Sequence, residues 1–190
     1  MDFNNSSVIN LLISKVFHDL GNVSALLNFF VELNKENPKE ADFSELEQIN
    51  RRNITTIAVL KYAFLTGEQD ENTFTNLKDY FFARKIELDL AIDTFCFCEN
   101  SLKITVHTLM LLSKIVYSGA KISLQNQQDK LLFNCKAKEE IEKARLAIFD
   151  NLDAQENVSV IFLKSAMEKA KMKLVYKFLS DKDLMIEFKK

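Results

Sequence analysis

The stretch that decides the fold is residues 14–33, SKVFHDLGNVSALLNFFVEL, which contains one of the two histidines of the chain. Apolar side chains recur every three or four residues from residue 7 to about residue 34, as they do on one face of an α-helix. The members of this stripe are Val8 or Ile9, Ile13, Val16, Leu20, Val23, Leu27 and Phe30. The pattern therefore predicts a long first helix.

A second helical pattern runs from about residue 43 to residue 65, beyond the only proline, Pro38. Its apolar stripe contains Leu46, Ile49, Asn53, Ile57, Leu60 and Phe64. Two long helices joined by a short loop fold back as an antiparallel hairpin. Because a hairpin cannot bury this much apolar surface alone, we expect residues 1–66 to pair with a second copy in a dimeric four-helix bundle.

The rest of the chain mixes short helical and strand patterns after a polar linker at residues 67–74. We expect helices at 76–84, 101–117, 139–149 and 158–169, and strands at 85–92, 120–126, 130–136, 173–180 and 183–189. This mixture predicts an α/β sandwich over residues 75–190. The whole chain is then an α+β protein with two lobes.

Composition limits the classes of function. The chain has 190 residues and a formal net charge of −2, which provides no general attraction to nucleic acid or to a membrane surface. Its longest uncharged stretch, residues 20–31, is much shorter than the roughly 20 apolar residues of a membrane span. We expect no signal peptide, and we expect the three cysteines to be reduced thiols of a cytoplasmic protein. Cys96, Cys98, Cys135 and His107 lack the spacing of a zinc finger, so no metal is expected.

His18 is the candidate for chemistry, because helical spacing directs it away from the apolar stripe. At 100° per residue, Ile9, Val16 and Leu27 fall on the side of the helix opposite His18. An exposed imidazole keeps a ring-nitrogen lone pair available for attack on phosphorus. An ordinary solvent-exposed histidine is the alternative interpretation. Residues on the same side as His18 are Leu11, Ser14, Lys15, Asn22, Ala25 and Phe29.

Polar neighbours suit phosphorylation of His18. The carboxylate of Asp19 can orient the imidazole, and the amide of Asn22, one turn on, can position a water or a phosphoryl oxygen. Folding about Pro38 places residue 18 level with about residue 59, so Lys61 is expected within a turn of His18, where it would offset phosphoryl charge. Another protein is expected to dock on the surface beside His18, at Leu11, Ser14, Lys15, Ala25 and Phe29.

The motif HDLGN, starting at His18, resembles the H-box of two-component histidine kinases, in which His-Asp or His-Glu is followed by Thr or Asn four places after the His. The longer stretch HDLGNVSALLNFFVEL is more similar to the ChpT-type histidine phosphotransferases of alphaproteobacteria. The matching residues are His18, Asp19, Leu20, Asn28, Glu32 and Leu33.

Two differences from this family stand inside the motif. Asn22 and Val23 replace its Ser-Pro, and Ala25 and Leu26 replace its Gly-Ala. Farther on, the stretch LKYAFLTG resembles the end of the family's second helix, with Lys61 in the place usually held by arginine.

The resemblance implies a homodimer that relays a phosphoryl group through His18 between receiver-domain aspartates in a two-component phosphorelay. It implies a hybrid histidine kinase as donor, response regulators as acceptors, magnesium brought by the receiver, and no cofactor of its own. It also implies a second lobe similar to a histidine-kinase ATPase domain, in a degenerate form that binds no nucleotide. The residues agree, since the chain has only three glycines and residues 101–117 contain neither Asn nor Glu. We therefore expect no ATP-dependent kinase activity.

Two other functions stay open. A non-catalytic kinase-like scaffold would bind and inhibit a kinase or response regulator, and a receiver phosphatase would act through Asn22. The remaining histidine, His107, has Ile104, Leu111 and Ile115 at helical spacing and is expected to pack in the core. The acidic run EEIEKAR at residues 139–145 is expected to be a solvated helix face.

Overall fold

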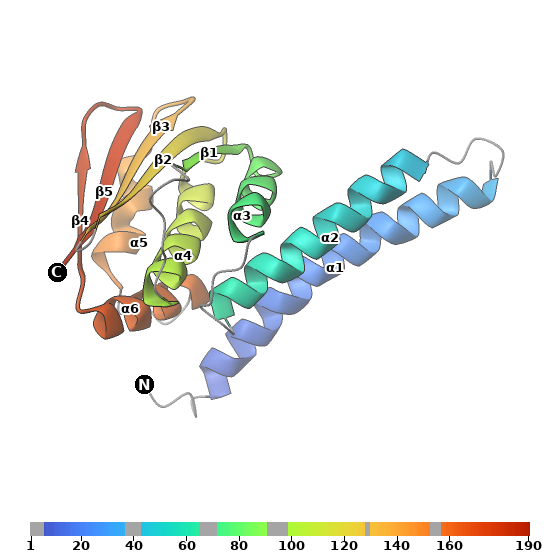
Figure 1. Ribbon diagram of the computed structural model, residues 1–190, viewed down its shortest axis with the longest axis horizontal. Coiled ribbons are helices and arrows are strands. Elements are labelled where there is room, and N and C mark those ends of the chain that lie inside the picture. Colours follow the sequence, from blue (N-terminus) through green and yellow to red (C-terminus); the bar gives the residue numbers. More distant parts are fainter. Residues whose placement is uncertain (1–5, 37–42, 65–71, 91–98, 128–129, 153–156) are drawn as a thin grey trace.

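The first part of the chain is a helical hairpin. The computed structural model describes residues 6–36, 43–64, 72–90, 99–127, 130–152 and 157–190. Helices α1 (Ser6–Glu36) and α2 (Phe43–Phe64) lie side by side, and one end of the pair projects beyond the second lobe (Figure 1). Both long helices predicted from the apolar spacing are confirmed. Residues 67–71 of the predicted linker lie outside the described residues. Helix α3 begins at Thr73, inside the predicted linker.

The two helices bury only part of the apolar stripes. Phe30 and Ile49 are buried, as the spacing predicts. Ile13, however, is 46% exposed and Ile57 is 55% exposed, although each belongs to a predicted stripe. Ile54, which lies outside the stripe, is 58% exposed. A contact between two helices covers a narrower band than these stripes, so part of the apolar surface of the hairpin stays open.

The second lobe is a sheet covered on one face by helices (Figure 1). Its elements are α3 (Thr73–Phe82), β1 (Ile86–Leu90), α4 (Glu99–Ile115), β2 (Ala120–Gln127), β3 (Lys130–Ala137), α6 (Val158–Ala170), β4 (Lys173–Phe178) and β5 (Asp183–Lys189). The five strands lie in the order β1-β2-β3-β5-β4. β1 and β2 are parallel, and the other neighbours are antiparallel. The predicted α+β class and the α/β lobe are confirmed.

The core of this lobe lies between the sheet and α4. Leu131, Phe133 and Cys135 alternate along β3 toward the helices, and all three are buried. Burial raises the pKa of the Cys135 thiol to about 12, so this cysteine is an inert apolar side chain at neutral pH. The other two cysteines, Cys96 and Cys98, lie outside the described residues.

His107 connects α4 to the end of the hairpin. Its Nε2 lies 3.0 Å from the carbonyl oxygen of Ala63 in α2, and its ring packs between Phe64 and Phe162, with centroids at 5.3 and 5.5 Å. The residue is fully buried, and burial lowers the pKa of the imidazole to about 4. A neutral ring that donates from Nε2 fits this site. The predicted core role of His107 is confirmed.

One predicted helix, at residues 139–149, is largely wrong. Helical structure begins only at Lys143, as the 3₁₀ turn η2 (Lys143–Leu146) and the single turn α5 (Ala147–Asp150). The Ile141 amide instead donates to the Asp181 carbonyl at 2.8 Å, a tertiary bond that competes with helix formation. The acidic side chains of this run are exposed, as expected.

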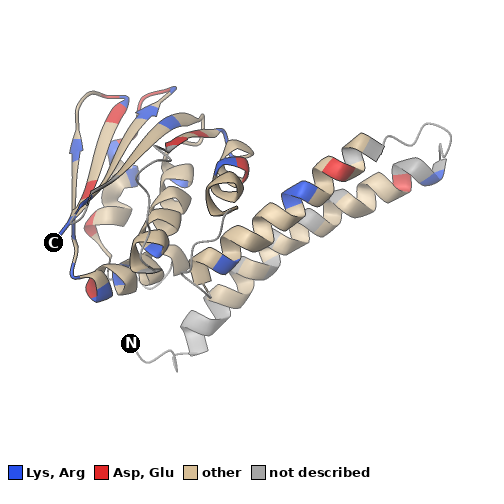
Figure 2. Ribbon diagram, viewed as in Figure 1, with Lys and Arg blue, Asp and Glu red and all other residues tan. Residues whose placement is uncertain are grey.

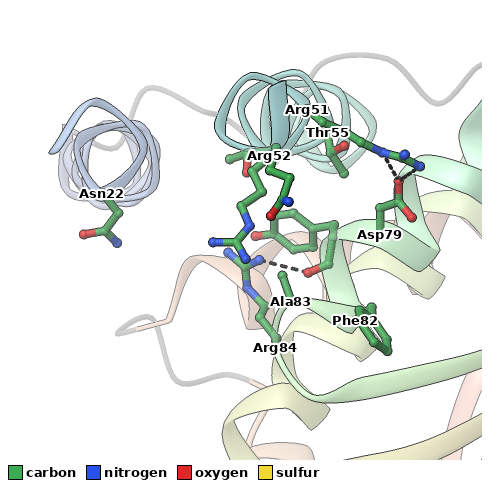
Figure 3. A pocket seen from close by; sticks show the side chains of 11 residues that line it. Asn22, Arg51, Arg52, Thr55, Asp79, Phe82, Ala83 and Arg84 are labelled. Carbon is green, nitrogen blue, oxygen red and sulfur yellow. Dashed lines mark hydrogen bonds and ion pairs between the residues drawn. The ribbon is translucent and has the colours of Figure 1, made fainter. Parts of the chain in front are cut away.

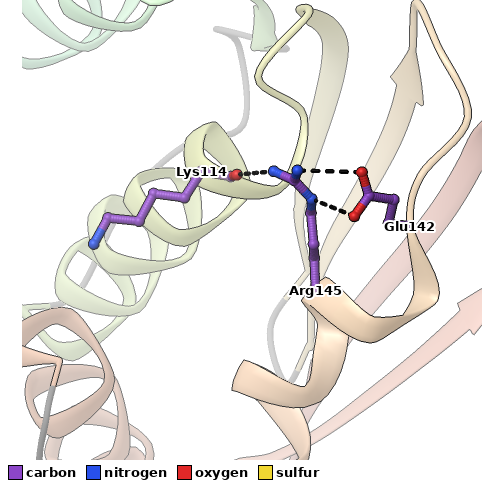
Figure 4. Close-up of polar contacts among 3 residues, drawn as sticks. All are labelled: Lys114, Glu142 and Arg145. Carbon is purple, nitrogen blue, oxygen red and sulfur yellow. Dashed lines mark hydrogen bonds and ion pairs between the residues drawn. The ribbon is translucent and has the colours of Figure 1, made fainter.

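Arg145 ties this segment to the end of α4 (Figure 4). Its guanidinium donates to both carboxylate oxygens of Glu142, at 3.0 and 3.2 Å, and to the Lys114 carbonyl at 3.3 Å. It also lies 4.6 Å from the centroid of the Tyr117 ring. The segment is therefore held by contacts with residues distant in sequence, which helical periodicity does not report.

Candidate functional site

The exposed side of α1 carries the predicted phosphoacceptor. His18 is exposed, and Ser14, Asn22, Ala25 and Phe29 are exposed at spacings that place them on the same side of the helix. Phe29 is 59% exposed, which is unusual for a large apolar side chain. The orientation of His18 away from the helix–helix contact is therefore as predicted.

Four further predicted site residues lie in α1 and α2. Leu11, Lys15 and Asp19 lie within α1, and their side chains are outside the described ones. Lys61 is exposed in the last turn of α2. The roles assigned to these four residues stay predictions.

A cleft of about 660 Å³ lies one helical turn from His18, between the two lobes. Asn22 of α1 lines it, together with the α2 residues Gln48, Arg51, Arg52, Thr55 and Thr56. The other wall is the end of α3 and the turn after it, at Asp79, Tyr80, Phe82, Ala83 and Arg84. Helical packing of α2 on α3 creates this cleft, because residues at three- and four-residue spacing on α2 face α3.

Two arginines of this cleft have contrasting partners. Arg51 donates from Nε and Nη2 to one carboxylate oxygen of Asp79, at 2.9 and 2.7 Å. Arg84 donates to the Tyr80 carbonyl at 3.1 Å, and its guanidinium lies 3.6 Å from the centroid of the Tyr80 ring. Asp79 is therefore already paired, whereas Arg84 is held by neutral groups.

Arg52 of α2 and Arg84 both line this cleft, and Figure 3 shows Arg52 extending from α2 to the side of the cleft where Arg84 lies. Figure 2 shows the basic band that Arg51 and Arg52 form in the middle of α2. Sequence analysis missed this cleft. The adjacent arginines in NRRN and the single Arg84 after the next helix were visible signals, but only the packing of α2 on α3 brings them together.

Two kinds of feature are absent from the part of the chain that the structure describes. There, no three His, Cys, Asp or Glu side chains gather in a way that could hold a metal ion. In the same residues, no helix is both long and apolar enough to cross a membrane.

Comparison with known proteins shows what fold this is. No family model and no curated protein matches the chain. Among solved structures, a bacterial phosphotransferase matches 100% of this chain and 98% of its own, with a TM-score of 0.77 at 14% identity. The histidine kinase domain of a blue-light-activated histidine kinase from Erythrobacter litoralis has a TM-score of 0.44 at 8% identity, covering 92% of this chain and 94% of that one. The histidine kinase AdeS of Acinetobacter baumannii has a TM-score of 0.42 at 12% identity, covering 90% and 96%.

The match to the bacterial phosphotransferase identifies the fold, because it covers both lobes in the same arrangement. From end to end, the chain has the fold of a bacterial phosphotransferase, which is the fold implied by the resemblance to ChpT-type phosphotransferases.

Proposed function

We propose that this chain is a histidine phosphotransferase, which relays a phosphoryl group through His18 between receiver-domain aspartates in a two-component phosphorelay. The observation that carries the proposal is the exposure of His18 on a helix face that also presents Asn22, Ala25 and Phe29. A fold shared along its whole length with a bacterial phosphotransferase supports it. The donor would be the receiver of a hybrid histidine kinase, and the acceptors would be response regulators.

The chemistry consists of two transfers to and from one ring nitrogen. In the first, the lone pair of the His18 nitrogen attacks the phosphorus of an aspartyl phosphate. An N–P bond forms as the P–O bond breaks, and the donor carboxylate leaves. In the second, a carboxylate oxygen of the acceptor aspartate attacks the phosphohistidine, and the N–P bond breaks. Catalysis is mainly in-line positioning, with magnesium brought by the receiver.

Three residues would have separate roles in positioning the reacting groups. Asp19 would orient the imidazole, Asn22 would hold a phosphoryl oxygen, and Lys61 would offset the charge of the group in transit. The surface formed by Leu11, Ser14, Lys15, Ala25 and Phe29 would dock the receiver. Its aromatic and apolar area suits a protein partner better than a small molecule.

A homodimer is part of the proposal. Ile13 of α1 and both Ile54 and Ile57 of α2 are about half exposed in the single chain. A second hairpin packed on them would form the four-helix bundle and remove this apolar area from water. We place the dimer in the cytoplasm.

Transfer of radiolabelled phosphate tests the function. Receiver domains from the same genome are labelled and mixed with the purified wild type or with His18→Gln, and labelled ATP alone is the control. We expect label on the wild type only, and none from ATP. An Asn22→Ala variant is run beside them, because a receiver phosphatase would lose release of inorganic phosphate when Asn22 is replaced.

The outcomes separate the three functions. Label on the wild type but not on His18→Gln supports the relay. Receiver binding without label on either protein contradicts the relay and leaves the scaffold. Loss of receiver label as inorganic phosphate, dependent on Asn22 and equal in wild type and His18→Gln, indicates the phosphatase.

A further inference from the structure

The cleft between the lobes contains two guanidinium groups that no carboxylate neutralises. Arg52 and Arg84 form no ion pair with any carboxylate in the part of the chain that the structure describes. Both residues nevertheless line the same cleft (Figure 3). Two positive charges that line one cleft both attract an anion that enters it.

The contacts within the cleft leave its positive charge uncompensated. The Asp79 carboxylate, which also lines it, is occupied by Arg51 through two hydrogen bonds, at 2.9 and 2.7 Å. Arg84 is oriented by the Tyr80 carbonyl at 3.1 Å and by stacking on the Tyr80 ring at 3.6 Å. Both of these partners are neutral, so the positive charge of Arg84 is not compensated. A guanidinium held in place by neutral groups is pre-organised to bind a carboxylate or a phosphate through two parallel hydrogen bonds.

The position of the cleft indicates its ligand. Asn22 lines the cleft and lies four residues after His18, which is about 6 Å along an α-helix. A globular domain that brings an aspartate to His18 therefore also covers the cleft. Phe82, which is 73% exposed, lies on the opposite wall and extends the apolar docking area. Arginine and aromatic residues that surround a pocket are typical anchors of a protein interface.

We infer that the Arg52–Arg84 cleft is a second recognition site for the receiver domain, which inserts an acidic side chain between the two guanidinium groups. This inference rests on the proposed function, because it takes the receiver as the partner. The carboxylate would fix the rotation of the receiver about His18. It would also select receivers that have an acidic residue at that distance from the phosphorylated aspartate.

The experiment measures binding of unphosphorylated receiver domains from the same genome by titration calorimetry. The variants are Arg52→Gln, Arg84→Gln and the double variant. Lys35→Gln, which removes one exposed positive charge from the distant end of α1, is the control for long-range charge. We expect each arginine change to raise the Kd by about tenfold and to weaken its salt dependence, while Lys35→Gln binds as the wild type does. Free glutamate and inorganic phosphate are titrated separately.

Charge reversal provides a sharper test. Arg84→Glu should abolish binding of the receiver, and one Asp→Lys or Glu→Lys variant from a scan of the receiver surface should restore it. Arginine variants that bind every receiver as the wild type does would overturn the inference. It would also be overturned if free phosphate or glutamate bound at the arginines while receiver affinity stayed unchanged, since the cleft would then be a site for free anions.

Failure of this inference and failure of the proposed function are distinguishable. If label is transferred through His18 and the arginine variants bind receivers as tightly as the wild type does, only the inference about the cleft is contradicted. If the arginine variants bind receivers more weakly but no label appears on His18, only the relay is contradicted, and the inference about the cleft is supported. If the wild type binds no receiver at all, both are overturned.

Discussion

The two lobes of this chain bury their apolar surface in different ways. In the α/β lobe, Leu109, Phe133 and Ile186 are completely buried, and the last turns of α2 add Val59, Tyr62 and Ala63 to the same core. The hairpin leaves Phe29, Ile54 and Ile57 more than half exposed. Away from this shared core, the hairpin has an open apolar face that only a partner could cover. This difference is the reason for placing the proposed dimer contact and the proposed docking surface on the hairpin.

The two histidines follow the same division. His18, on the hairpin, is exposed, whereas His107, in the lobe, is fully buried between two aromatic rings. The same side chain thus packs in the core in one place and has the proposed role in phosphoryl transfer in the other, and solvent access makes the difference.

The largest expected effect is on the proposed dimer. Replacing Ile54 and Ile57 together by Asp puts four charges into the proposed bundle, because each change occurs in both copies. Burial of an Ile side chain contributes about 1.5 kcal/mol or more, so the loss is on the order of 6 kcal/mol. This corresponds to an increase of about 10⁴-fold in the dissociation constant, which light scattering after size exclusion would detect as a monomer.

The lobe offers a matched control for that experiment. Val175 in β4 and Leu179, just after this strand, are apolar and about half exposed. Their joint replacement by Asp should leave a dimer. If the lobe variant became monomeric and the hairpin variant stayed dimeric, the assignment of the dimer interface to the hairpin would be wrong.

The next effect concerns His107 and pH. Burial lowers the pKa of its imidazole to about 4 in the folded chain, against about 6.5 in the unfolded chain. The unfolded state therefore binds more protons between these two values. The free energy of unfolding should fall by about 3 kcal/mol from this group as the pH decreases from 6.5 to 4, and this contribution should level off below pH 4.

Urea unfolding across this pH range, with wild type, His107→Phe and Thr108→Val, checks the effect. His107→Phe should lose the part of the pH dependence that comes from the imidazole, at the cost of the hydrogen bond to Ala63. Thr108→Val alters a buried neighbour that does not titrate and should keep the wild-type slope. Identical slopes in all three proteins would contradict a low pKa for His107.

The smallest effect is local and lies in the lobe. Arg145→Ala removes the contacts to Glu142, to the Lys114 carbonyl and to the Tyr117 ring (Figure 4). Amide exchange of residues 142–150 should become roughly several-fold faster, while that of α4 stays unchanged, since these contacts restrain only the local segment. Arg145→Lys keeps the charge without the planar fork and should also exchange faster. Uniform acceleration across the whole lobe would show instead that Arg145 supports the global fold.

Local patterns accounted for much of the fold. Spacings of three and four predicted α1 and α2, and strand patterns predicted β2, β3, β4 and β5. These predictions held because the apolar face of a helix or strand must point to a core wherever that core lies. The segment at 139–149 failed, because the bond from Ile141 to Asp181 and the contact of Arg145 with α4 join residues far apart in the chain. A periodicity contains no information about such partners.

The candidate site divides in the same way. The sequence by itself determined that His18 points away from the stripe of α1, since helical geometry sets the direction of each side chain. It also determined that His107 belongs to the core. Only the tertiary structure decided that Asn22, Arg52 and Arg84 share one cleft, because they come from three elements whose packing brings them together. Tertiary packing also decided that Ile57 stays exposed in the single chain, since one hairpin is too narrow to cover both of its apolar stripes.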